Sequence, residues 1–235
     1  PAVGSWVTYG LGTLNDNLPG FVVLPRNSYP QGGASNWSNG YLPADHQGTP
    51  LRPEGSPILD LHAPAGVTRK DQRHNLDLLA KLNGKHFKAR PDQGELDARM
   101  SSYELAYRMQ TDAREAFDIA GEKPETVAKY GANAQGRQML IARRLLERGV
   151  RFVQVRQGGW DLHGGIAQRA ANNARQLDPA IGAIMDDLKE RGLFEDTLIY
   201  ITSEFGRSPT EDGGGGRSHN ARGLSTVLMG GGIKG

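Results

Sequence analysis

The segment 197–220 constrains the fold more than any other part of this chain. It reads TLIYITSEFGRSPTEDGGGGRSHN, so a run of β-branched and aromatic residues is followed by Glu204, Arg207, a glycine-rich loop and His219. In open α/β sheets, ligand-binding side chains gather beyond the carboxyl ends of the strands, because the backbone stops pairing there. The segment therefore predicts a strand over 198–203 that ends in a polar site.

A second polar segment follows another predicted strand. Residues 150–155 read VRFVQV, and the glycine-flanked sequence QGGWDLHGG comes directly after them. A right-handed strand–helix–strand crossover predicts parallel pairing of 150–155 with 198–203, which brings both carboxyl ends to one edge of the sheet. We therefore expect four potential ligands to meet at that edge: Asp161, His163, Glu204 and His219.

Composition excludes several classes of protein. The chain has 235 residues, of which 37% are hydrophobic, which is enough for a folded core. Its formal charge of +2 gives no field that would favour nucleic acid or a membrane surface. No apolar run approaches the roughly 20 residues that cross a bilayer. Because cysteine is absent, any metal must be bound by histidine, carboxylate, hydroxyl or water.

Local signals predict several helices and one insertion. Ser5 is expected to cap a short helix near the start, and the sequence from Thr68 to Asp71 has the pattern of a capping box. A later helix is expected to break or kink at Pro179. Residues 26–130 combine a loop rich in glycine, proline, serine and asparagine with two amphipathic helices, so we expect an insertion beside the sheet.

Several motifs along the chain resemble the DUF1501 family, a large bacterial group that is frequent in planctomycetes. They are GSWVTYGLG, LPGFVVL, TRKDQRHNLDLLAKLN, GGWDLHGG, ITSEFGRSP, GRSHN and MGGGIKG, so the resemblance covers nearly the whole chain. This family is related to the alkaline phosphatase and sulfatase superfamily. The relationship implies an α/β/α sandwich with a largely parallel central sheet, a site for two metal ions, and an exported or periplasmic location.

The same resemblance implies a domain organisation. Residues 1–235 are expected to form a single incomplete alkaline phosphatase-like domain that contains the insertion 26–130. The chain begins at Pro1 without an initiator Met and stops inside a glycine-rich sequence, so we expect an internal piece of a longer protein.

The metal ligands of the superfamily can be compared with this chain motif by motif. Asp161 and His163 match an Asp and a His that bind one metal, although the usual spacing is longer. An Asp-His pair after the next strand is matched by Glu204 and Phe205, so the carboxylate is kept and the imidazole is lost. A late Gly-x-His is matched by the sequence RSH that ends at His219. The remaining metal-binding Asp and the nucleophile lie upstream, so no catalytic residue is assigned.

These ligand types suit Zn²⁺, Mn²⁺ or Mg²⁺, and Ca²⁺ stays open because sulfatases of the superfamily use it. Such an ion lowers the pKa of a bound water and neutralises the oxygens of a tetrahedral ester. Arg207 is expected to bind phosphate or sulfate oxygens with its forked guanidinium group. The expected cofactor is therefore a divalent metal ion, and its identity is open.

Each candidate residue also has a structural interpretation. Asp161 and His163 can form a hydrogen-bonded pair in a glycine-rich loop, and Glu204 and Arg207 can form an ion pair at a strand end. His219 can be a surface histidine without a function. Taken together, however, four ligand-type residues at three strand ends favour a shared metal site.

Two classes of function remain open. The first is a metal-dependent hydrolase of sulfate or phosphate esters, whose substrate is a small molecule or a polysaccharide and whose nucleophile lies outside this sequence. The second is a binding or scaffold protein with a degenerate metal site, for which Phe205 is the main argument. The sequence gives no indication of the oligomeric state.

Overall fold

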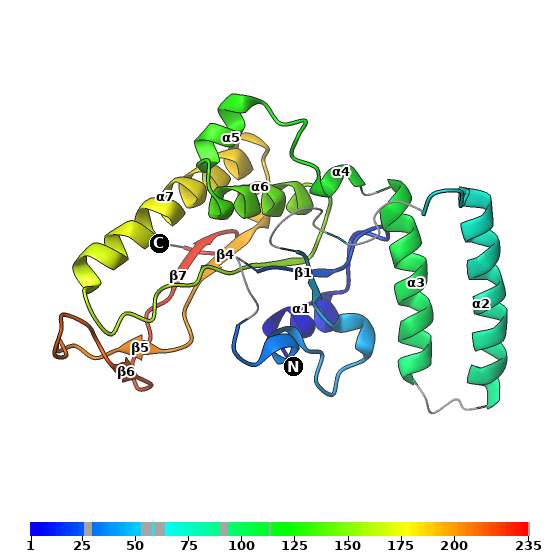
Figure 1. Ribbon diagram of the computed structural model, residues 1–235, viewed down its shortest axis with the longest axis horizontal. Helices are drawn as coiled ribbons and strands as arrows, with labels where there is room; N and C mark the ends of the chain where they lie inside the picture. Colours follow the sequence, from blue (N-terminus) through cyan, green and yellow to red (C-terminus); the bar gives the residue numbers. More distant parts are fainter. Residues whose placement is uncertain (26–29, 53–57, 59–63, 90–93, 113, 235) are drawn as a thin grey trace. The chain divides into compact units, whose positions relative to one another are not determined.

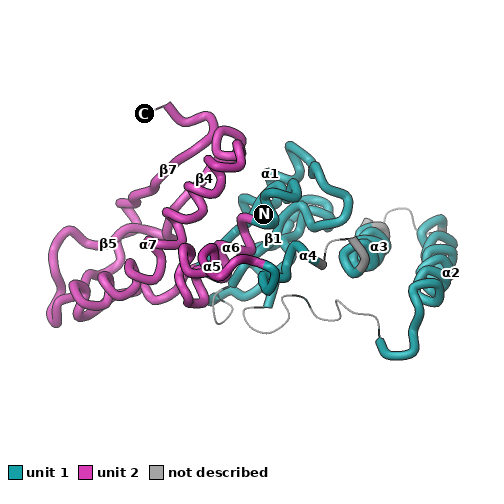
Figure 2. Tube along the Cα trace, turned by 90° about the horizontal axis from the view of Figure 1, so that it is seen from above, with its two compact units in different colours: residues 1–121, 144–156 teal, residues 122–143, 157–235 magenta. Residues whose placement is uncertain are grey.

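A computed structural model describes residues 1–25, 30–52, 58, 64–89, 94–112 and 114–234 of the chain (Figure 1). The chain forms two compact units, which Figure 2 shows in different colours. Unit 1 comprises residues 1–121 and 144–156, and unit 2 comprises residues 122–143 and 157–235. The single incomplete domain expected over 1–235 stays a prediction.

A three-stranded parallel sheet forms the core of unit 1. Its central strand is β1 (Phe21–Leu24), which pairs with β2 (Thr49–Pro50) on one side and with β3 (Phe152–Val155) on the other. All four residues of β1 are buried, as expected for an apolar run that is covered on both faces of a parallel sheet. The rings of Phe21 and Phe152 meet edge to face at 5.1 Å and join β1 to β3.

Helix α1 (Val3–Leu11) packs against this sheet in unit 1. A Cβ atom at Gly4 would lie 2.7 Å from the rings of Phe21 and Phe152, so only glycine allows this approach. The expected cap at Ser5 is wrong. Ala2 is the residue before the helix, and the buried Ser5 hydroxyl donates a hydrogen bond to the carbonyl oxygen of Ser38.

Unit 1 also contains, among its described residues, the helices α2 (Arg69–Ala89), α3 (Gly94–Asp112) and the short α4 (Arg114–Phe117). They fall inside the predicted insertion 26–130, which also contains the short 3₁₀ helices η1 (Gly33–Trp37) and η2 (Ala44–His46). The predicted capping box is confirmed, because the Thr68 amide donates to the Asp71 carboxylate and the Asp71 amide donates to the Thr68 hydroxyl.

Unit 2 contains α5 (Pro124–Tyr130), the first part of α6 (Ala134–Leu146) and the long α7 (Ile166–Glu190). The predicted break at Pro179 is wrong, because α7 continues through this residue. A proline costs a helix one hydrogen bond. Here the helix is held by a buried apolar face on its carboxyl-terminal half: Ala180, Ala183, Ile184 and Leu188.

A buried carboxylate, Asp187, joins the helices of unit 2. It accepts hydrogen bonds from the Tyr130 hydroxyl at 2.9 Å and from the Lys129 ammonium at 3.0 Å, both on α5. Arg143 of α6 lies 3.5 Å from the same carboxylate. Burial raises the pKa of the Tyr130 hydroxyl, and its hydrogen bond to Asp187 raises it further, so this hydroxyl remains a donor.

The strands of unit 2 form two short antiparallel pairs. One is β4 (Leu198–Ile201) with β7 (Val227–Gly230), and the other is β5 (Gly206–Arg207) with β6 (His219–Asn220). The predicted parallel ladder between 150–155 and 198–203 is therefore wrong in the described part of the chain.

The glycines at the end of β7 explain its position beside β4. A Cβ atom at Gly230 or Gly231 would lie 2.1 Å from a carbonyl oxygen of the segment that leads into β4, which contains the 3₁₀ helix η3 (Phe194–Asp196). The Gly231 amide donates to the Thr197 carbonyl oxygen at 3.0 Å. Close approach of these glycines fixes β7 against β4.

The fold is therefore mixed α/β and contains a small three-stranded parallel sheet. Among the helices of the described residues, none is both long enough and apolar enough to cross a membrane.

Candidate functional site

The candidate site lies wholly within unit 2 and is formed by two glycine-rich segments. One is the loop 157–165 that precedes α7, and the other is the hairpin that contains β5 and β6 (Figure 1). In this hairpin Arg207 and His219 are directly opposite each other across the two strands. Cross-strand partners have neighbouring side chains, so the ladder places these two beside one another.

Backbone hydrogen bonds hold the two segments together. The Arg217 amide donates to the Leu162 carbonyl oxygen at 3.0 Å, and the amides of Gly165 and Ile166 donate to carbonyl oxygens of the glycine run. Leu162 is buried, whereas the flanking Asp161 and His163 are exposed. The buried leucine thus anchors the loop while its two polar neighbours remain accessible.

Gly216 is required for this contact. A Cβ atom at this position would lie 2.1 Å from the carbonyl carbon of His163 and 2.4 Å from the amide nitrogen of Gly164. No side chain fits at such distances. From the sequence, the glycine run EDGGGGRS was predicted only to be a loop. In the structure its glycines allow the hairpin to approach the loop 157–165.

Three of the four predicted ligands meet at one point. The Nε2 atoms of His163 and His219 are 3.1 Å apart, and each lies 3.0 Å from Oδ1 of Asp161. The three side chains are between 50% and 63% exposed. The cluster is therefore open to solvent on one side and accessible to a ligand.

These three contacts cannot all be hydrogen bonds. A carboxylate oxygen is an acceptor, and each Nε2 atom carries either a proton or a lone pair, depending on the tautomer. If both nitrogens are protonated, two N–H groups oppose each other between His163 and His219. If either nitrogen is not protonated, its lone pair faces the Asp161 oxygen. Every assignment of protons leaves a repulsive contact.

A divalent cation fits this donor set. Two imidazoles and one carboxylate are common ligands of Zn²⁺ and of other divalent transition metals. Ligand atoms bound at about 2.1 Å to one ion are about 3.0 Å apart at octahedral angles and about 3.4 Å apart at the tetrahedral angles usual for Zn²⁺. The observed separations of 3.0 and 3.1 Å lie at the octahedral end of that range.

Glu204 lies outside this cluster of three and is bound to Arg207 instead. The guanidinium Nη2 of Arg207 donates to Oε1 of Glu204 at 3.1 Å, and Nη1 donates to Oδ1 of Asp161 at 2.6 Å. The ion pair considered from the sequence for Glu204 and Arg207 is thus present. Hydrogen bonds from His219 and then from Arg207 lower the pKa of Asp161 to about 2, so this carboxylate is ionised at neutral pH.

Phe205 has a structural role that the sequence did not reveal. Its ring centroid is 4.6 Å from that of His219, and the Arg207 guanidinium lies 5.6 Å from the centre of the same ring. From the sequence, Phe205 was notable only as the position of a lost imidazole. An aromatic residue two positions before an arginine was the signal that could have indicated this cation–π contact.

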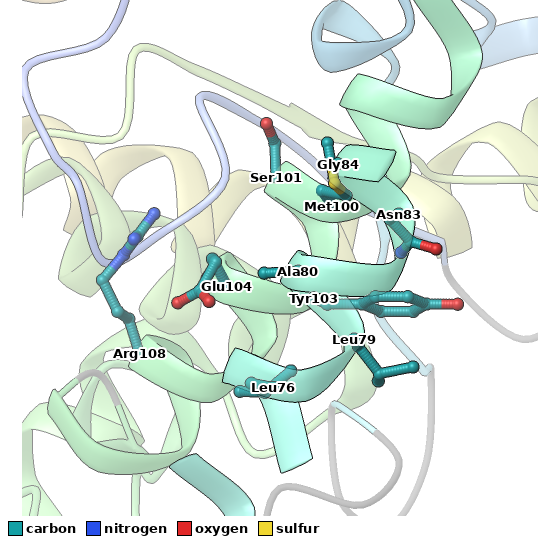
Figure 3. Close-up of a pocket in the computed structure, with 10 residues that line it drawn as sticks. All are labelled: Leu76, Leu79, Ala80, Asn83, Gly84, Met100, Ser101, Tyr103, Glu104 and Arg108. Carbon is teal, nitrogen blue, oxygen red and sulfur yellow. The ribbon is translucent and has the colours of Figure 1, made fainter. Parts of the chain in front are cut away.

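A separate groove of about 470 Å³ lies in unit 1 between α2 and α3 (Figure 3). Its lining is mainly apolar and includes Leu76, Leu79 and Met100. The Glu104 carboxylate at its edge is bound by Arg73 at 2.6 Å, which joins the two helices. None of the residues singled out from the sequence as ligands lines this groove.

Comparison with known proteins gives one match. The family model described as "Protein of unknown function (DUF1501)" matches residues 1–235. Neither the curated proteins nor the solved structures contain a match to this chain. The relationship to the alkaline phosphatase and sulfatase superfamily stays a prediction.

Proposed function

Because this chain belongs to the DUF1501 family, whose description assigns no activity, we propose its function from the site: metal-dependent hydrolysis of phosphate or sulfate esters. The observation that carries the proposal is the cluster of Asp161, His163 and His219. With Asp161 ionised, at least one of its three mutual contacts of 3.0 to 3.1 Å is repulsive for any arrangement of protons on the histidines, and all three are suited to a shared cation.

The donor set narrows the choice of metal. Two imidazole nitrogens favour Zn²⁺, Mn²⁺ or Fe²⁺, whereas Mg²⁺ and Ca²⁺ prefer sites built from oxygen atoms. Of the four ions considered from the sequence, Zn²⁺ and Mn²⁺ therefore fit His163 and His219 best. The expected family fold, an α/β/α sandwich, belongs to the same proposal, for which the parallel sheet of unit 1 is partial support.

A divalent ion held by three protein ligands supplies a water of lowered pKa and polarises an ester oxygen. Asp161, His163 and His219 hold the ion, and their exposure leaves room for water and substrate. The activated water can attack the ester whether or not the protein nucleophile that the family resemblance implies takes part.

Charge supports an anionic ester as the substrate. The ligand set contains one carboxylate, so a divalent ion bound to it keeps a net positive charge. Arg207 and Glu204 contribute opposite charges beside it and cancel. A phosphate or sulfate group would thus be attracted to the site, whereas a neutral ester would gain nothing from this charge. Binding of the ester oxygens by Arg207 stays a prediction.

The second candidate function is that of a metal-containing binding or scaffold protein. The position of Phe205 favours this function, because its ring packs against His219 and fills one side of the cluster. A substrate has less room to approach from that side. The two candidates share the metal and differ in turnover.

The test uses protein stripped with a chelator and reloaded with Zn²⁺, Mn²⁺, Mg²⁺ or Ca²⁺ in turn. Metal content is measured after desalting, and turnover is measured with aryl phosphate and aryl sulfate. We expect tight uptake of Zn²⁺ or Mn²⁺ that is lost in His219→Ala and kept in His74→Ala, since His74 is an exposed histidine of α2. Metal uptake without turnover would favour the scaffold. Equal metal content in the two variants would exclude the proposed site.

A further inference from the structure

We propose that this site takes a single divalent ion and that the Arg207 guanidinium is its permanent second positive charge. The proposal rests on the proposed function, since it concerns the number of ions held by the same site. It assigns Glu204 the role of a positioning residue that acts through Arg207, in place of the ligand role expected from the sequence.

The position of the guanidinium is the first argument. Arg207 bridges two carboxylates, with Nη1 at 2.6 Å from Asp161 and Nη2 at 3.1 Å from Glu204. A metal ion shared by two acidic ligands would occupy the same position between the two carboxylates. A second ion bound by Glu204 would have to displace the guanidinium from both of these contacts.

The restraint on Arg207 is the second argument. Its side chain is 20% exposed, although the two carboxylates that it binds are 63% and 58% exposed. Its backbone lies in β5, opposite His219 in β6. A Cβ atom at the preceding Gly206 would lie 1.9 Å from the Gly223 carbonyl oxygen, so the strand fits closely against the following turn. The guanidinium is thus held in place and is not a mobile surface group.

The space beside His219 is the third argument. The Phe205 ring contacts the imidazole at a centroid distance of 4.6 Å and also lies 5.6 Å from the Arg207 guanidinium. An aromatic carbon surface offers no lone pair to an ion. Phe205 and Arg207 therefore take up space next to His219 and Glu204 without supplying a ligand for a second ion.

Fixed positive charge has a consequence for the chemistry. Arginine stays protonated at any pH of interest, so its charge does not depend on the concentration of free metal. Its Nη1 group donates to the Asp161 carboxylate and its Nη2 group donates to Glu204, so each carboxylate is bound to one side of the fork. The site would therefore be complete with one ion per chain.

The experiment counts bound ions. The full chain is stripped of metal and dialysed against Zn²⁺ or Mn²⁺ at several free concentrations. The number of ions bound per chain is then measured by elemental mass spectrometry and by native mass spectrometry. We expect one ion in the wild type, in Arg207→Lys and in Glu204→Gln. We expect two in Arg207→Met at the highest free concentration, because Asp161 and Glu204 then lack their cation. Arg222→Met, which changes an exposed arginine in the turn after β6, should keep one ion.

The outcomes separate this proposal from the proposed function. Two ions in the wild type would overturn the single-ion proposal and leave the proposed function standing. One ion or none in Arg207→Met would also overturn it, because the charge of Arg207 would then not be what excludes a second ion. No ion in the wild type would overturn both. If Arg207→Met does not fold, as judged by circular dichroism, the number of ions bound by the wild type and by Glu204→Gln still tests whether the site holds a single ion.

Discussion

The Nε2 atoms of His163 and His219 lie 3.1 Å apart, although the two residues are separated by 56 positions in the chain. The two nitrogens cannot both satisfy each other and the ionised Asp161 carboxylate by hydrogen bonding alone. Side chains whose mutual contacts are repulsive without a ligand are typical of binding sites, because the bound ligand makes the same arrangement favourable. The functional proposals above follow from this contact.

The two histidines should be equally important for metal uptake. His163→Ala and His219→Ala each remove one of three ligands, so we expect each to lower the affinity for Zn²⁺ by at least about 100-fold, beyond the 10- to 100-fold typical of outer-shell changes. Competition with a chromophoric chelator measures the affinity. His74→Ala is the control and should match the wild type. A loss confined to one histidine would contradict the shared site.

Gly216→Ala should weaken metal binding without removing any ligand. Its Cβ would lie 2.1 Å from the backbone of His163, so the loop must move and carry the imidazole with it. We expect at least about a tenfold loss in affinity for Zn²⁺, which is typical of changes that misplace a ligand. The matched control is Gly213→Ala, since a Cβ atom there meets nothing within 4 Å. Equal effects of the two changes would refute this role for Gly216.

Asp187→Asn should destabilise unit 2. Asp187 is almost fully buried and accepts hydrogen bonds from Lys129 and Tyr130, so the change replaces a buried charged acceptor by a neutral amide and weakens both bonds. Removing the acceptor of buried hydrogen bonds in this way costs about 1–3 kcal/mol. Chemical denaturation measures the free energy of unfolding. Asp186→Asn is the control, because its exposed carboxylate lies 3.6 Å from the same lysine, and it should cost less than about 1 kcal/mol.

The pairing of α2 with α3 should weaken in acid. The hydrogen bonds from Arg73 lower the pKa of Glu104 below its usual value, so the folded state binds the proton less readily than the unfolded state does. The stabilisation is therefore complete above the ordinary pKa of a glutamate and is lost as the pH falls through the lowered one. Hydrogen exchange of the helix amides between pH 6 and pH 3 should show this loss. Glu104→Gln should remove that part of the pH dependence, and an unchanged profile would contradict this account.

The sequence alone was informative wherever the determining contacts are local. The capping box of Thr68 and Asp71 needs only residues three positions apart. The spacing of Asp161 and His163 around Leu162 likewise put both polar groups on the accessible side of one loop. Membership in the DUF1501 family was also evident from motifs along the chain.

Two of the expectations that failed show long-range contacts outweighing local preference. Pro179 should have interrupted a helix, but the buried apolar face of α7 holds the helix together through it. The strand at 198–203 was expected to pair in parallel with 150–155. It pairs instead with β7, because Gly230 and Gly231 permit a close antiparallel approach that no single-strand pattern reveals.

The sequence by itself determined which side chains were available for a site: Asp161, His163, Glu204, Arg207 and His219. Only the tertiary structure decided which of them contact each other: Asp161 and the two histidines form one cluster, and Glu204 is bound to Arg207. The physical reason is that a residue type fixes the chemistry of a group, whereas its partner depends on backbone hydrogen bonds and glycine contacts. Those contacts join segments about 50 residues apart, and no local pattern encodes them.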